Sequence, residues 1–187
     1  MSDSILSLPD RLVDCALALL EQGESDVSLR AVARAAGVSA MAPYRHFEDK
    51  AALMGAVALK GFAMLEADTA RADEADDPGE ALTAQGLAYV GFARAHPALF
   101  RLMFADGAGL DLPPGDCQGA YTLMARRIAE LAPHQVEAGG LACWGLVHGL
   151  ATLALDGRIP ADPAADRAAL ALMMQALRAA PPVPIGF

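Results

Sequence analysis

The stretch VSLRAVARAAGVSAMAPYRHFEDKAAL, residues 27–53, contains start and end signals for two short helices. Ser28 is a candidate N-cap for the first helix, and Gly37 is suited to end it in the left-handed backbone conformation. Ser39 is a candidate cap for the second helix, which we expect to run through Phe47. Two short helices joined by a glycine-containing turn form a helix-turn-helix, which lays its second helix in the major groove of DNA.

Pro43 lies at the start of the expected second helix, where backbone N–H groups mostly lack partners within the helix. The side chains behind it that donate hydrogen bonds are Tyr44, Arg45, His46 and Lys50. Residues 28–47 contain three arginines and no acidic residue, although the whole chain carries a net charge of −9. This local positive charge favours a nucleic-acid partner. The same spacing also fits an ordinary helical corner with solvated arginines.

The rest of the chain has the pattern of further helices. Apolar residues recur at helical spacing in 9–22, and Asp49 is a candidate cap for a long helix. Further helices are expected at 50–72, 80–95, 97–104, 117–132, 134–156 and 162–180. The Gly- and Pro-rich segment 106–116 is expected to be a loop. The prediction is an all-α fold, in which a three-helix helix-turn-helix domain (8–50) is joined by a long helix to a larger helical domain (51–181).

The composition argues against several classes of protein. Hydrophobic residues make up 55% of the chain, and charged residues (20%) are expected to interrupt every apolar stretch before the ~18 residues of a membrane span. The start of the chain has no secretory signal pattern. Cys15, Cys117 and Cys143 are odd in number and far apart, which suits a reducing cytoplasm better than a disulfide framework. We therefore expect a cytoplasmic protein with no cofactor, no metal and no membrane partner.

An enzyme is not expected either. Cys143 and His148 are five residues apart, which is too far round a helix for a good nucleophile–base pair. No spacing typical of metal ligands is present.

The quoted stretch resembles the DNA-binding domain of the TetR/AcrR transcriptional regulators. In that family S/T-L-R-x-(I/V)-A-x-x-A-G-V-S precedes Y-x-H-F-x-x-K and a long helix. CWGLVHGLATLALDGRI (143–159) resembles the Trp-His-Gly signature of one branch of TetR-like C-terminal domains, and AYVGFARAHPALFRLMF (88–104) is similar to the same branch. The resemblance implies a regulator, more commonly a repressor, whose operator binding is modulated by a small, largely apolar ligand.

The resemblance also implies which residues contact DNA. The implied DNA-binding set is Ser28, Arg30, Ser39, Ala40, Met41, Ala42, Pro43, Tyr44, Arg45, His46 and Lys50. Phosphate contacts would come from Ser28, Tyr44, His46 and Lys50. Arg30 and residues 40–43, together with Arg45, would face the bases. Because residues 40–43 carry no hydrogen-bonding side chains, base reading there is limited to apolar contact, and hydrogen-bonded reading would fall on the arginines.

In the C-terminal part the resemblance implies a ligand pocket and a dimer interface, with helices 134–156 and 162–180 pairing across a two-fold axis. Ala142, Gly145 and Gly149 lie at helical spacing, which suits close approach of a partner helix or close packing within one subunit equally well. The candidate pocket residues are Phe92, Phe100, Met103, Phe104, Tyr121, Met124, Trp144 and His148. For each of them, an ordinary core position is the alternative.

The expected partners are a palindromic double-stranded operator, a small-molecule effector and a second copy of the chain. The competing interpretation is a helical small-molecule-binding or interaction module that has lost specific DNA binding. The acidic total charge and the apolar residues 40–43 favour that alternative.

Overall fold

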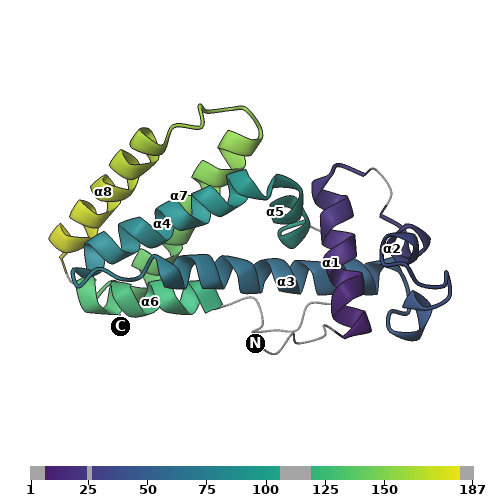
Figure 1. The fold of residues 1–187 in the computed structure, drawn as a ribbon. Helices are drawn as coiled ribbons and strands as arrows, with labels where there is room; N and C mark the ends of the chain where they lie inside the picture. Colours follow the sequence, from purple (N-terminus) through teal and green to yellow (C-terminus); the bar gives the residue numbers. More distant parts are fainter. Residues whose placement is uncertain (1–6, 25–26, 106–118, 182–187) are drawn as a thin grey trace, which may run out of the picture. The chain divides into compact units, whose positions relative to one another are not determined.

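The computed structural model describes residues 7–24, 27–105 and 119–181. These residues form eight α-helices and one short 3-10 helix, and none of them lies in a strand, which confirms the all-α prediction (Figure 1). The elements in chain order are α1 (Leu8–Glu21), α2 (Leu29–Ala35), η1 (Pro43–Arg45), α3 (Lys50–Arg71), α4 (Pro78–Ala95), α5 (Pro97–Met103), α6 (Gly119–Leu131), α7 (Val136–Leu155) and α8 (Pro163–Ala179). The predicted loop at 106–116 and Cys117 lie outside the described residues.

Local capping signals place the ends of α2 and the start of α3. The Oγ atom of Ser28 accepts a hydrogen bond from the Ala31 N–H at 3.3 Å, at the start of α2. The Oδ1 atom of Asp49 accepts from the Ala52 N–H at 2.8 Å, in the first turn of α3. Gly37 has a φ of 69°, the left-handed conformation that ends α2. All three ends are as predicted, because caps and left-handed glycines depend on residues within one turn.

The predicted helix from Ser39 through Phe47 is wrong. Only η1 forms there, flanked by turns, and it begins after Ala42 without a side-chain cap. Pro43 has no N–H, so it cannot donate to the Ser39 carbonyl as an α-helix would require. The backbone closes tighter turns instead: the Ala42 N–H donates to the Ser39 carbonyl, and the His46 N–H donates to the Pro43 carbonyl, both at 2.9 Å.

The chain divides into two compact units, and the division differs from the predicted boundary at residue 50. The first unit takes the described parts of Met1–Phe62 and His96–Asp116, and the second takes those of Ala63–Ala95 and Cys117–Phe187. The first half of α3 and the whole of α5 therefore belong with the N-terminal helices. The reason is tertiary packing, which joins α5 to α1 over a long separation in sequence.

The core of the first unit lies between α1, α2, α3 and α5. Its fully buried large side chains include Leu12, Val32, Leu53, Val57 and Leu99. Gly61 lets α3 and α5 approach closely, since a Cβ atom on it would lie 2.6 Å from the sulfur of Met103. A side chain at residue 61 would therefore displace the side chains of Met103 and Leu99.

In the second unit α4 is the central helix, in contact with α6, α7 and α8. The buried core cluster of this unit comprises Leu82, Ile128, Ala132, Cys143, Met174 and Leu177. Gly86 on α4 makes room for the side chains of Leu170 and Val147, because a Cβ atom there would come within 2.7 Å of Leu170.

Asp73, which follows α3, ties together three segments of the second unit. Its carboxylate is only 6% exposed and accepts hydrogen bonds from Arg127 Nε at 2.7 Å and Gln85 Nε2 at 2.9 Å, and it pairs with Arg126. Burial alone would raise the pKa of Asp73. The hydrogen bonds from Arg127 and Gln85 and the two arginine charges outweigh burial, so the pKa lies below its ordinary value. The carboxylate thus fixes the α3–α4 connection to α4 and α6.

Candidate nucleic-acid interface and effector site

Helix α2 separates an apolar inner face from a basic outer face. Its buried residues are Leu29, Val32 and Ala33, while Arg30 and Arg34 are exposed. The helix end is closed by the Val38 N–H, which donates to the Ala33 carbonyl at 3.0 Å. Arg11 of α1 donates from Nη2 to the Ala36 carbonyl at 2.9 Å. These contacts set the direction in which the chain leaves α2 for η1.

The segment around η1 exposes most of the side chains that were predicted to meet DNA. Ser39, Ala40 and Met41 are exposed, Met41 by 66%, and Ala42 and Phe47 are half-buried. The hydrogen-bonding side chains that η1 and its flanks expose are Tyr44, Arg45, His46 and Lys50.

Pro43 is the exception in this segment. Its ring is less than 2% exposed, so the prediction that it faces the bases is wrong. The ring packs inward because η1 is a single short turn whose inner side must cover α2, with which it is in contact. Pro43 therefore packs on the buried side of the segment, while Met41 and Tyr44 are exposed to solvent.

The outer surface of α2 and η1 carries positive charge, and the acidic residues nearest to it in the sequence are Asp26, Glu48 and Asp49. No acidic residue occurs between residues 28 and 47. The side chains of Arg30, Arg34 and Arg45 form no ion pair with any residue that the structure describes. Half-buried Ser28 and exposed Lys50 flank this surface at the starts of α2 and α3. Such a surface is suited to phosphate oxygens.

The predicted pocket residues are divided between the two units. Phe100, Met103 and Phe104 lie on α5 in the first unit, where the Phe104 ring centre is 4.8 Å from that of Phe100 and 5.4 Å from that of Phe62 on α3. Phe100 and Met103 are buried. Phe100 and Met103 thus occupy core positions of the first unit, and Phe104 is half-buried.

Four aromatic side chains of the second unit form a connected row over α4, α7 and α6. Tyr89 Oη and His148 Nδ1 are 2.9 Å apart, and the ring of Trp144 is centred 6.2 Å from both His148 and Tyr121. Burial raises the pKa of Tyr89, which a hydrogen bond with Trp144 only partly opposes, and burial lowers the pKa of His148. Both shifts favour the neutral forms, so the Tyr89–His148 contact is a hydrogen bond between uncharged groups.

A groove lies between α3 and α4 within the second unit, with a volume of about 450 Å³. The residues that line it are Asp68, Arg71, Ala72, Ala88, Gly91, Phe92 and Ala95. Phe92 is the one predicted pocket residue among them, and Met124 packs instead against the core cluster around Ile128. The α4 residues 88, 91, 92 and 95 recur at helical spacing, but nothing in the sequence pairs them with α3.

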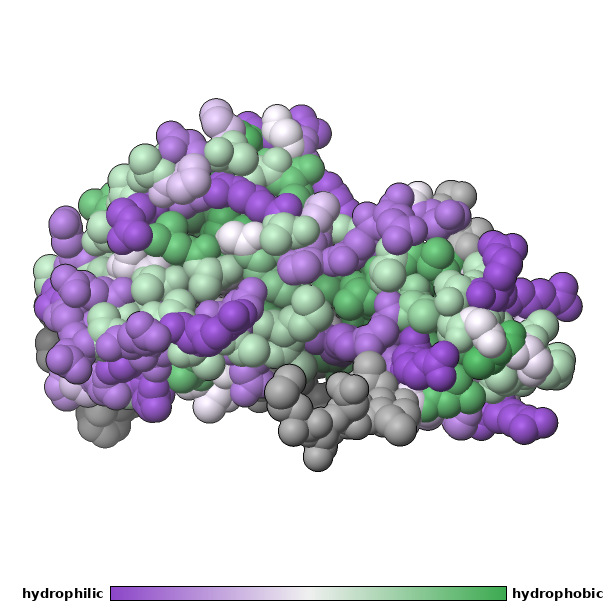
Figure 2. All heavy atoms as spheres, viewed as in Figure 1, coloured by the Kyte–Doolittle hydropathy of each residue, from purple (hydrophilic) through white to green (hydrophobic). Residues whose placement is uncertain are grey.

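Gly145 and Gly149 lie on α7, where their spacing in the sequence fits either close packing within the subunit or close approach of a partner helix. A Cβ atom on Gly145 or Gly149 would meet nothing within 4 Å, so these glycines do not serve close packing within the subunit. Leu141 on α7 and Leu172 on α8 are 68% and 67% exposed. Hydrophobic residues thus reach the surface of this unit between charged ones, as Figure 2 also shows for one face.

Helix α7 also corrects an expectation from composition. By length and composition alone it is apolar enough to cross a membrane, and residues 138–155 contain no Asp, Glu, Lys or Arg. The expectation that charges interrupt every apolar stretch is therefore wrong here. Only 28% of its most apolar stretch is buried, which leaves a large apolar surface to be covered.

Comparison with known proteins adds independent information. Residues 12–57 match the family model described as bacterial regulatory proteins, tetR family, and residues 82–177 match the model described as tetracyclin repressor-like, C-terminal domain. A structure of a protein with unknown function from Rhodococcus sp. RHA1 is 30% identical, with a TM-score of 0.77 over 95% of this chain and 99% of that one. No curated protein matches the chain.

Two further solved structures share the fold at lower identity. The TetR family transcriptional regulator PfmR from Thermus thermophilus is 20% identical, with a TM-score of 0.65 over 91% of this chain and 97% of that one. A TetR variant from Acinetobacter baumannii AYE, in complex with minocycline, is 20% identical, with a TM-score of 0.65 over 94% of this chain and 99% of that one.

Proposed function

Because this chain belongs to the TetR family of bacterial regulatory proteins, we propose that it is a repressor that binds a palindromic operator as a homodimer. Members of this family are DNA-binding transcriptional regulators, not enzymes. The observation that carries the proposal is the exposed, acid-free surface of α2 and η1 in a chain with a net charge of −9. In an acidic protein, a local basic surface of this kind has a specific use, which we take to be phosphate binding.

The roles of the residues on this surface follow from their chemistry. Tyr44, His46 and Lys50, with Ser28, donate to phosphates, which sets the register of the protein on DNA. Ala40 and Met41 contact bases through apolar surface, such as thymine methyl groups. Arg30 provides hydrogen-bonded reading, with Arg45 as a second candidate.

Arg30→Ala is expected to weaken operator binding by about 1–3 kcal/mol and to relax the preference at one base pair, because its guanidinium group can pair with guanine through two hydrogen bonds.

Lys50→Ala is expected to weaken binding to operator and random DNA about equally. It should also lower the slope of log K against log salt by roughly one. Gel shifts with the DNA upstream of the protein's own gene, at several salt concentrations, measure both effects.

The ratio of specific to non-specific affinity separates the two roles. If Lys50→Ala collapses that ratio while Arg30→Ala leaves it unchanged, the roles are reversed. If the unmodified protein binds no DNA more tightly than random duplex, the alternative of a helical ligand-binding or interaction module is favoured.

The dimer is proposed to form through the outer faces of α7 and α8. Gly145 and Gly149 present open backbone at the centre of the α7 face, and Leu141, Leu153 and Leu172 surround it with exposed apolar side chains. A two-fold contact would bury this surface twice and place two DNA-binding units on one palindrome. A dimer interface accounts for the apolar character of α7 without a membrane, in agreement with a cytoplasmic location.

The effector is proposed to be a small amphipathic, largely apolar molecule that binds the groove between α3 and α4. The groove has a volume of about 450 Å³, within the roughly 300–1,000 Å³ of small-molecule sites, but it is largely open to solvent and would leave much of a ligand exposed. Ala88 and Ala95 offer apolar surface in front of the buried Phe92, while Asp68 and Arg71 offer charge. The partly exposed Tyr121 and Trp144 of the aromatic row are a second candidate site. Trp144 and His148 belong to the segment 143–159 that resembles the Trp-His-Gly branch.

Ligand binding can weaken DNA binding only through a difference in affinity for two states of the protein. We propose that the ligand favours a state in which the two DNA-binding units have a different spacing. The minocycline complex of the Acinetobacter baumannii protein supports a small-molecule effector but does not identify this one.

Gly91→Leu is expected to remove the response to the effector while DNA affinity stays unchanged. A Cβ atom on Gly91 would meet nothing within 4 Å, so leucine is accommodated and its side chain occupies the groove. Thermal-shift screening of amphipathic compounds finds binders, and gel shifts with those binders measure the response. Ala67→Leu, on an exposed position of α3, is the matched control. A binder that stabilises Gly91→Leu as much as the unmodified protein would locate the effector elsewhere.

A further inference from the structure

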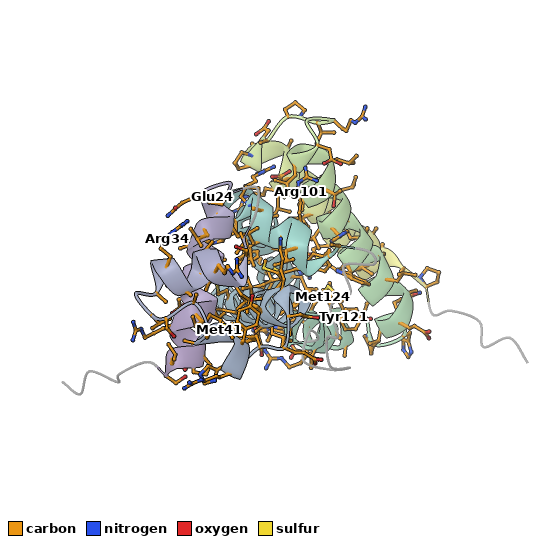
Figure 3. All side chains as sticks on the ribbon, turned by 90° about the vertical axis from the view of Figure 1, so that its right-hand side faces the viewer. Glu24, Arg34, Met41, Arg101, Tyr121 and Met124 are labelled. Carbon is orange, nitrogen blue, oxygen red and sulfur yellow. The ribbon has the colours of Figure 1, made fainter. Side chains whose placement is uncertain are left out.

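Helix α2 carries two arginines, of which only Arg30 belongs to the DNA-binding set that the family resemblance implies. Arg30 and Arg34 are one helical turn apart, so they lie on the same face, and both are exposed. Figure 3 shows Arg34 at the periphery of the first unit. Neither the family resemblance nor the spacing of the motif assigns Arg34 a contact.

The fold does not need the charge of Arg34. Its side chain forms no hydrogen bond or ion pair with another residue in the described part of the chain, and the inner face of α2 is apolar. A cation near the C-terminus of a helix is ordinarily stabilising because it faces the negative end of the helix dipole. Here Arg11 already fills that position, since its Nη2 donates to the carbonyl of Ala36 at 2.9 Å.

The free protein gains nothing from two like charges four residues apart on one short helix, because they repel each other. No acidic residue between residues 28 and 47 offsets them. The pair becomes favourable when an anion lies against this face. In a helix-turn-helix the first helix crosses the DNA backbone, so the anion at the C-terminal end of α2 is a phosphate.

We infer that Arg34 binds a backbone phosphate of the operator and is a second DNA anchor on α2, beside Arg30. This inference rests on the proposed function. Arg34 contributes affinity and not sequence preference, because phosphates are the same at every base pair. The anchor also compensates for the apolar residues 40–42, which donate no side-chain hydrogen bonds to DNA.

Arg34→Ala is expected to weaken binding to the upstream DNA and to a random duplex of the same length by the same factor. The slope of log K against log salt should fall by roughly one, because one phosphate contact is lost. Arg34→Lys is expected to keep the slope, since it keeps the charge. Arg158→Ala is the control, because it makes the same change in net charge at an exposed position between α7 and α8.

Three outcomes would overturn the inference. An unchanged salt slope for Arg34→Ala excludes a phosphate contact. A lower melting temperature with an unchanged slope assigns Arg34 to the fold. A changed ratio of specific to non-specific affinity makes it a base-reading residue. If the unmodified protein does not bind the upstream DNA, the proposed function fails; if it does and Arg34→Ala binds identically, only this inference fails.

Discussion

Gly145→Glu is expected to convert the proposed dimer into a monomer and to lower operator affinity by at least about 100-fold. The substitution puts a carboxylate at the centre of the outer face of α7, where a second copy would bury it without a partner. A monomer engages one half-site, and joining two half-site readers raises affinity by roughly 10²–10⁴-fold. The loss of the dimer therefore removes most of the operator affinity without touching the DNA-binding surface.

Gly145→Glu should leave the fold of the single subunit intact. A Cβ atom on Gly145 meets nothing within 4 Å, and glycine in a helix interior is about 1 kcal/mol less favourable than alanine. Light scattering at micromolar concentration gives the oligomeric state, and gel shifts give the affinity. Thr122→Glu, which adds the same charge at an exposed position of α6, should remain dimeric. A Gly145→Glu protein that stays dimeric would show that the interface lies elsewhere.

Asp73→Ala is expected to lower the free energy of unfolding by about 1–3 kcal/mol, the usual loss when buried donors lose their acceptor. Arg127 keeps its ion pair with Glu130, so its charge does not become uncompensated. The change leaves Arg127, whose side chain is 15% exposed, and Gln85 without their shared acceptor. Denaturant unfolding at pH 7 measures the loss. Asp68→Ala is the matched control on α3, because the Asp68–Arg71 pair is more exposed and should contribute no more than about 1 kcal/mol. Equal losses for the two variants would contradict a special role for Asp73.

The contribution of Asp73 should also depend on pH with a definite sign. Its folded-state pKa is below the ordinary value of 3.8, so its contribution is complete above the pKa of the unfolded chain. That contribution is lost as the pH falls through the lowered folded-state value. The difference in stability between Asp73→Ala and the unmodified protein should therefore shrink below roughly pH 4. A difference that stays constant from pH 7 to pH 3 would mean that the ionised carboxylate is not its source.

Sequence alone was sufficient to predict the series of helices and several of their ends. The cap of Ser28 on α2, the cap of Asp49 in α3 and the left-handed Gly37 were all predictable. Each depends on backbone groups within one turn of the chain, so the residues that decide it are neighbours in sequence. The family was also predictable, because its motif consists of such neighbours.

What only the tertiary structure decided concerns residues far apart in sequence. Pro43 is buried, Gly145 is open and α5 belongs with the N-terminal helices, and none of these follows from helical spacing. Whether a side chain is core or surface depends on which distant helix packs over it. An apolar residue at helical spacing has the same pattern in a core, a groove or a dimer face, and the packing of the helices distinguishes the three.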